Sequence, residues 1–186
     1  MRRILLLACT ALLALPALPA VAEAQADDAV AKALLAAPTR ARDDAGVVAW
    51  IDDGSRVVLK ESSNGMVCWD QSSWPSQRPF SVRCTAEANL PRVEQNRAFL
   101  MEAGSAEDAR ALFDAAEADG TRAVSQFGTN YYSLQGNDPD NAFPHVTIST
   151  PHATGESLGL PNRPSAATAW VMNEGTSGAH IMIPGR

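Results

Sequence analysis

Residues 46–60 have the sequence pattern of a β-hairpin, which constrains the fold class more than any other feature of the chain. Two apolar, β-branched segments, 46–51 and 56–59, flank an Asp-Asp-Gly turn at 52–54. An Asp-Gly pair between such segments is the strongest short-range hairpin signal. Further strand-like segments cover 66–69, 81–84, 129–135, 145–150, 167–172 and 179–183. We therefore expect a mostly antiparallel sheet built from hairpins.

The middle of the chain is helical in character. Ser105 stands three residues before Asp108, as in a helix capping box, and Gly120 supplies a stop signal. Residues 91–103 fit neither the helical nor the strand period cleanly, and we predict a helix there too. The predicted fold is α+β, with one or two helices inserted between the two halves of the sheet.

The first 26 residues have the three parts of a secretory signal peptide. Arg2 and Arg3 precede an apolar run over 4–22, and small residues allow cleavage after Ala24 or Ala26. An uncleaved membrane anchor is the alternative, because about 18 apolar residues can just span a bilayer. We predict cleavage and a periplasmic or extracellular protein.

The rest of the chain divides into two parts. Residues 27–45 are rich in alanine and have little apolar bulk, so we expect a loosely docked helical arm and a linker. Residues 46–186 are expected to form a single domain. No second segment approaches bilayer-spanning length, so we expect no membrane span after cleavage and a soluble product.

The charge of the processed chain argues against a nucleic-acid partner. Cleavage removes two arginines and one glutamate, which takes the formal net charge from −6 to −7. Only Lys32 and Lys60 supply lysine, and no basic stretch could neutralise phosphates. The sequence identifies no other partner.

Two cysteines, Cys68 and Cys84, remain after signal cleavage. An even pair in an oxidising compartment predicts a disulfide. A redox-active pair is a weaker alternative because the C-x-x-C spacing is absent.

Histidine and methionine gather in the last quarter of the chain. His180 and Met182 would share one face of a strand, and His145 is a third candidate ligand. Imidazole and thioether groups suit copper, chiefly Cu(I), so we consider a copper site. The alternative is a packed histidine beside a gap-filling methionine. No other cofactor is expected.

Three aromatic residues lie in and beside the segment that the disulfide would close. Trp69, Trp74 and Phe80 could form an exposed ligand-binding surface. Packing around the disulfide is the alternative, and we regard it as the stronger one.

No catalytic constellation assembles from the sequence. Residues 155–159 match G-x-S-x-G, but Pro161 and Pro164 deny Ser157 the strand-turn-helix setting of a nucleophile elbow. We therefore predict no catalytic residues, and the leading hypothesis is a non-enzymatic binding or envelope-associated domain. The alternatives are a periplasmic copper binder and an enzyme that uses His145 or His180 with a nearby acid.

Several motifs resemble those of a group of uncharacterised secreted or periplasmic bacterial proteins. They are Ser63-Asn64-Gly65 followed by the two cysteines, and the closing pattern WVM…GT..AHIMIP over 170–184. The resemblance covers about half of the processed chain. It implies export and a one-domain fold, and it implies no catalytic residue.

Overall fold

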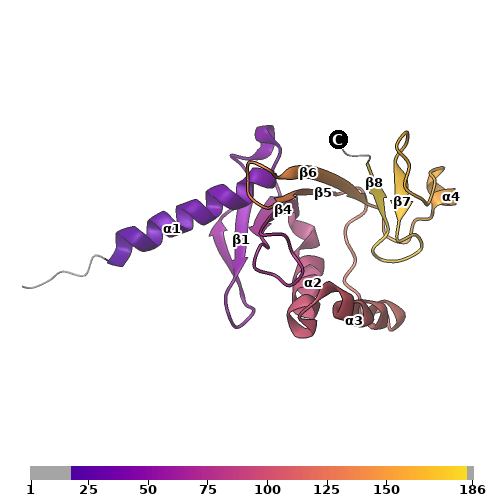
Figure 1. Cartoon of the computed structure of the whole chain (residues 1–186), viewed down its shortest axis with the longest axis horizontal. Coiled ribbons are helices and arrows are strands. Elements are labelled where there is room, and N and C mark those ends of the chain that lie inside the picture. The colour runs from indigo at the N-terminus through magenta and orange to yellow at the C-terminus, as the bar shows by residue number, and fades with distance from the viewer. Residues whose placement is uncertain (1–17, 184–186) are drawn as a thin grey trace, which may run out of the picture.

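The computed structural model describes residues 18–183, which form one eight-stranded sheet with helices on both faces (Figure 1). The strand order is β2-β1-β3-β4-β5-β6-β8-β7. The strands are β1 (Gly46–Trp50), β2 (Arg56–Lys60), β3 (Met66–Asp70), β4 (Phe80–Ala86), β5 (Asn130–Gly136), β6 (Phe143–Ser149), β7 (Trp170–Met172) and β8 (His180–Met182). The α-helices are α1 (Leu18–Ala33), α2 (Leu90–Ala103), α3 (Ala106–Ala118) and α4 (Gly155–Leu158), and three short 3-10 turns complete the fold.

The strand pairing confirms the α+β prediction. Neighbouring strands are antiparallel, except that β1 and β3 run parallel. The hairpins β1-β2, β3-β4, β5-β6 and β7-β8 form the sheet, and α2 and α3 are inserted between β4 and β5. Local chemistry sets these elements. Gly54 adopts a φ of +87° in the first hairpin turn, and the Ser105 hydroxyl accepts the Asp108 N–H at 3.0 Å to begin α3.

Each face of the sheet has its own apolar cluster. On one face α2 and α3 cover a cluster that includes Val48, Val67, Trp69 and Val93. On the other face, the end of α1 and the following 3-10 turn cover Val47 and both cysteines. Side chains alternate between the faces along each strand, so the two clusters use alternate residues of the same strands.

Cys68 and Cys84 are joined by a disulfide, as predicted. They stand directly opposite each other on β3 and β4, with an S–S distance of 2.04 Å, and both are fully buried. The bridge therefore fixes the register of these two central strands.

The N-terminal segment packs more tightly than we expected. Ala33, Leu34 and Ala37 are buried against the sheet, and the Lys32 ammonium is 2.5 Å from an Asp70 carboxylate oxygen on β3. Small side chains allow this close approach, so the expectation of a loosely docked arm is wrong.

Most of the predicted signal peptide lies outside the described residues, and α1 begins within its last part, at Leu18. Among residues 18–183 no helix has the length and apolar character required to cross a bilayer.

Candidate functional site

A cleft opens between the α2-α3 helix pair and the sheet. It consists of two cavities, of about 570 and 320 Å³, that share six lining residues and are therefore continuous. The shared residues are Arg83, Arg92, Asn96, Tyr131, Asn173 and Gly178. Volumes of this size accommodate small organic ligands.

The floor of the cleft is a set of side chains aligned across the sheet. Trp69 on β3 is opposite Arg83 on β4, Arg83 is opposite Ser133 on β5, and Ser133 is opposite His145 on β6. Residues opposite each other point to the same face of a sheet. This register is what brings Arg83 and His145 into one cavity, although 62 positions separate them in the sequence.

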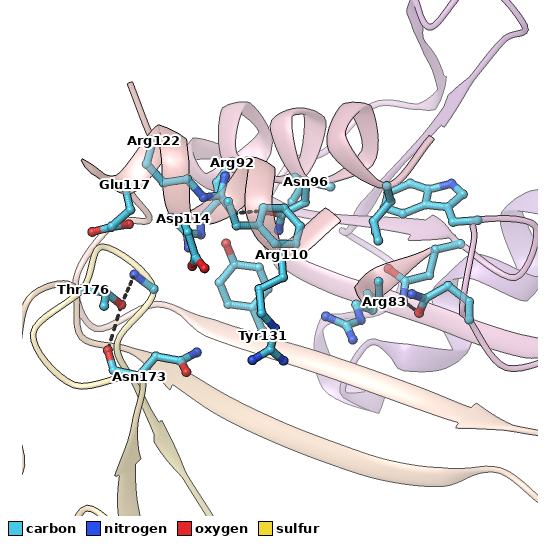
Figure 2. A pocket seen from close by; sticks show the side chains of 18 of the residues that line it. Arg83, Arg92, Asn96, Arg110, Asp114, Glu117, Arg122, Tyr131, Asn173 and Thr176 are labelled. Atoms are coloured by element: carbon cyan, nitrogen blue, oxygen red, sulfur yellow. Dashed lines mark hydrogen bonds between the residues drawn. The ribbon is translucent and has the colours of Figure 1, made fainter. Parts of the chain in front are cut away.

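Arginines dominate the larger cavity. Arg83, Arg92, Arg110 and Arg122 line it, against the two carboxylates of Asp114 and Glu117. Figure 2 shows the guanidinium groups of Arg83 and Arg110 projecting into the opening between the helices and the strands. The whole chain is acidic, so this concentration of positive charge is local.

Neutral oxygen atoms hold two of these arginines in place. Arg92 Nη1 donates to the Ala123 carbonyl oxygen at 2.5 Å and to Ser177 Oγ at 3.0 Å. Arg122 is only 8% exposed and donates to the side-chain oxygens of Gln95 and Asn96. Burial and the nearby charge of Arg92 lower the pKa of Arg122 to about 10. The guanidinium groups are thus fixed in position without neutralisation by a directly bonded carboxylate.

Glu117 has a separate partner. Its Oε1 accepts the Ser177 N–H at 2.6 Å, and its Oε2 accepts the Ser177 hydroxyl. Burial opposes ionisation of Glu117, but the bonds from Ser177 and the charges of Arg92 and His152 lower its pKa. These bonds hold the β7-β8 turn against α3. Both oxygens of the Glu117 carboxylate, which lies at the edge of the cleft, already accept hydrogen bonds.

Arg83 is the unusual member of the group. Its Nε atom is buried and has no hydrogen-bond partner, and it takes part in none of the ion pairs found in the described part of the chain. Burial lowers the pKa of its guanidinium. An unpaired buried donor on a cation is costly, and an anionic ligand in the cleft would satisfy it.

Tyr131 stands next to this group on β5. Its hydroxyl is 2.7 Å from Ser125 Oγ, and burial raises its pKa, so it is protonated at neutral pH. The cleft therefore presents several guanidinium groups and a neutral phenol, a set suited to binding carboxylate or phosphate oxygens.

The predicted metal ligands lie in the smaller cavity. His145, His180 and Met182 all line it, together with Met172, which the sequence analysis did not select. Within residues 18–183 no group of three or more His, Cys, Asp or Glu side chains is placed to hold a metal ion. The copper site stays a prediction, and any such site would depend on thioether ligands.

The three aromatic candidates are buried. Trp69, Trp74 and Phe80 are 2%, 8% and 3% exposed. Trp69 and Trp74 line the larger cavity, whereas Phe80 lies on the opposite face beneath Lys32, whose Nζ is 5.7 Å from the ring centroid. They do not form an exposed surface, and packing accounts for their positions.

The residues considered for catalysis do not come together. Ser157 Oγ accepts the Thr154 N–H at 3.0 Å in the capping box of α4, which occupies the hydroxyl structurally. His180 Nδ1 is 2.8 Å from the Gly178 carbonyl oxygen. In the part of the chain that the structure describes, no histidine forms an ion pair with a carboxylate.

The sequence analysis missed the arginines. The alternation in β4 could have drawn attention to Arg83. One face of this strand is apolar, with Phe80, Val82 and Cys84, and the other face carries Ser81, Arg83 and Thr85. A half-buried charged side chain on the helix-covered face of a central strand is rare without a partner, and such positions are often functional.

Comparisons with known proteins gave no relatives. No family model, no curated protein and no solved structure matches the chain. The resemblance described above therefore stays a prediction, and function has to be argued from the cleft itself.

Proposed function

We propose that this is an exported, non-enzymatic binding protein whose cleft holds a small organic anion through carboxylate or phosphate oxygens. The observation that carries the proposal is Arg83, whose Nε is buried in the cleft wall without a partner. Arg42 and Arg97 also have a buried Nε without a partner, but Arg83 is the one of these that lines the cleft, and leaving a buried donor unsatisfied is unfavourable. A ligand oxygen at this point would supply the missing partner.

The neighbouring arginines support the same ligand class. Arg92 and Arg122 have only neutral oxygens as hydrogen-bond partners, and Arg110 is exposed at the cleft wall. Several guanidinium groups around one cavity favour a ligand with more than one negative charge. The cavity volume of about 570 Å³ suits a molecule larger than a simple ion.

Export is supported by two independent features. The N-terminal sequence has the charged start, apolar run and alanine-rich cleavage region of a signal peptide. The buried Cys68–Cys84 disulfide belongs to the kind of bond that persists in oxidising compartments. The hydroxyl of Ser157, the one nucleophile that the sequence singled out, is engaged in the capping box of α4, which is consistent with a binding role.

Thermal unfolding with citrate and with inorganic phosphate as probes tests the binding proposal, at ionic strength matched with sodium chloride. A ligand at ~100 times its Kd adds about 2.7 kcal/mol to the free energy of unfolding, and this raises the midpoint by about 5 to 11 °C. We expect such a rise for at least one probe with the wild-type protein and none with Arg83→Met.

Arg56→Met is the matched control, because Arg56 lies on β2, outside the cleft, and pairs with Glu94 on the surface. It should keep the full response to the anion. If neither anion raises the midpoint more than sodium chloride does, or if Arg83→Met responds like the wild type, the proposal is wrong.

A further inference from the structure

The last two strands place two methionines and a histidine on the same face of the sheet. Met172 on β7 is directly opposite His180 on β8, and Met182 follows His180 by two positions. Residues two apart on a strand point to the same face, and opposite residues have Cβ atoms about 4.5 to 5.5 Å apart. All three side chains line the smaller cavity of the cleft.

One ring nitrogen of His180 is hydrogen-bonded to the backbone, and the other is available as a ligand. Its Nδ1 is 2.8 Å from the Gly178 carbonyl oxygen, and a carbonyl can only accept, so Nδ1 carries the proton. In neutral imidazole the other nitrogen, Nε2, then keeps its lone pair. A backbone carbonyl on one ring nitrogen is the usual support of a histidine that binds metal through the other.

The donor set selects the metal. Thioether sulfur and neutral imidazole are ligands that Cu(I) favours, whereas Zn(II) prefers thiolate, imidazole and carboxylate. The described residues place no cluster of three such zinc-type ligands together, and Cys68 and Cys84 are joined in a disulfide. A carboxylate-poor site also suits a singly charged ion in a cavity that contains Arg83.

We propose that Met172, His180 and Met182 form a Cu(I) site at the β7-β8 end of the cleft. His145 is the nearest further donor in the register: it stands two positions before Thr147, which is opposite Met182. The site does not depend on an anion bound at Arg83. It includes Met172, which lies next to His180 because β7 pairs with β8.

Anaerobic equilibrium dialysis against Cu(I) kept in solution by acetonitrile tests the site. We expect one Cu(I) per chain. Met172→Leu and Met182→Leu should each lower the affinity for Cu(I) about tenfold or more, because even the loss of a residue that only hydrogen-bonds to a metal ligand lowers metal affinity by this factor. Met101→Leu is the matched control, since Met101 is 49% exposed on α2 and outside both cavities. It should bind like the wild type.

NMR of the methionine methyl groups identifies the ligands in the intact protein, because Cu(I) is diamagnetic. The signals of Met172 and Met182 should move on titration, while those of Met66 and Met101 should stay. Binding well below one equivalent, or unchanged affinity in both leucine variants, overturns the site. Arg83→Leu, which adds no thioether to the cavity, should retain Cu(I) binding, and this separates the result from the test of the anion proposal.

Discussion

Replacement of Arg83 with methionine should stabilise the protein while abolishing anion binding. Methionine has a similar length and flexibility, so it can fill the space between Trp69 and Ser133 on the floor of the cleft. The substitution removes a buried donor that has no partner, at Nε of Arg83. Leaving such a donor unsatisfied costs about 1 to 3 kcal/mol, so we expect the free energy of unfolding to rise by about that amount.

Urea unfolding measured by tryptophan fluorescence gives the free energy directly, and thermal unfolding gives a second reading. For a domain of this size, the gain corresponds to an increase in the midpoint of roughly 2 to 12 °C. Arg56→Met removes a surface ion pair with Glu94 instead, and should lower the free energy of unfolding by no more than about 1 kcal/mol.

The opposite signs of the two effects make the comparison decisive. If Arg83→Met is destabilised by more than the control, then Arg83 has stabilising contacts that the reasoning overlooks. When a residue that serves folding is replaced, the protein loses stability. When a residue that serves a ligand is replaced, the protein loses binding.

Three further predictions concern the framework around the cleft. Asn89 is fully buried and its side chain makes three hydrogen bonds, so Asn89→Ala should lower the free energy of unfolding by about 2 to 4 kcal/mol in urea titrations. A midpoint change below that of Arg56→Met would contradict this. The double variant Cys68→Ala, Cys84→Ala opens a loop with a sequence separation of 16 and should lose about 3 kcal/mol by the same assay; no loss would show that strand pairing alone fixes the register. Burial and the charges of Arg83 and His180 lower the pKa of His145, so the folded state binds its proton at lower pH than the unfolded chain does. Its contribution to stability is therefore present above about pH 6.5 and is lost as the pH falls below that value, and His145→Gln should reduce this loss in unfolding measured from about pH 7 to 5. An identical pH dependence in the variant would refute the assignment.

Local sequence patterns predicted nearly every strand and helix. The Asp-Gly turn at 53–54 and the alternation in β6 and β8 depend on near neighbours, so they can be recognised without knowledge of the rest of the chain. The same is true of α3, whose start at Ser105 follows a capping pattern. The parallel pairing of β1 with β3 was not predicted, because nothing within either strand specifies its neighbour in the sheet.

The cleft could not be predicted in this way. Arg83, Arg92, Arg110 and Arg122 spread over 40 positions, and only the register of β4 with β5 and the packing of α2 and α3 bring them to one cavity. Arg92, Arg110 and Arg122 each resemble an ordinary surface residue in the sequence. The burial of Arg83 Nε, and its lack of a partner, are properties of the assembled fold.

The packing of the N-terminal segment shows a related limit. Ala33 and Ala37 contribute little apolar area, which suggested loose docking. In the structure their small size lets the backbone lie close to the disulfide-bonded strands, and they are 1% and 3% exposed. The close packing of these small side chains against the sheet determines the contact, and no sequence pattern reveals such packing.

The NMR signal of the Arg83 side-chain Nε–H tests the central claim most directly. Arg83→Lys assigns the signal by removing it, and citrate and inorganic phosphate are then titrated at constant ionic strength. We predict that this signal shifts and saturates with one of the two anions, while the signal of Arg56 stays in place. An Arg83 signal that does not move with either anion would contradict the assignment of the cleft as an anion-binding site.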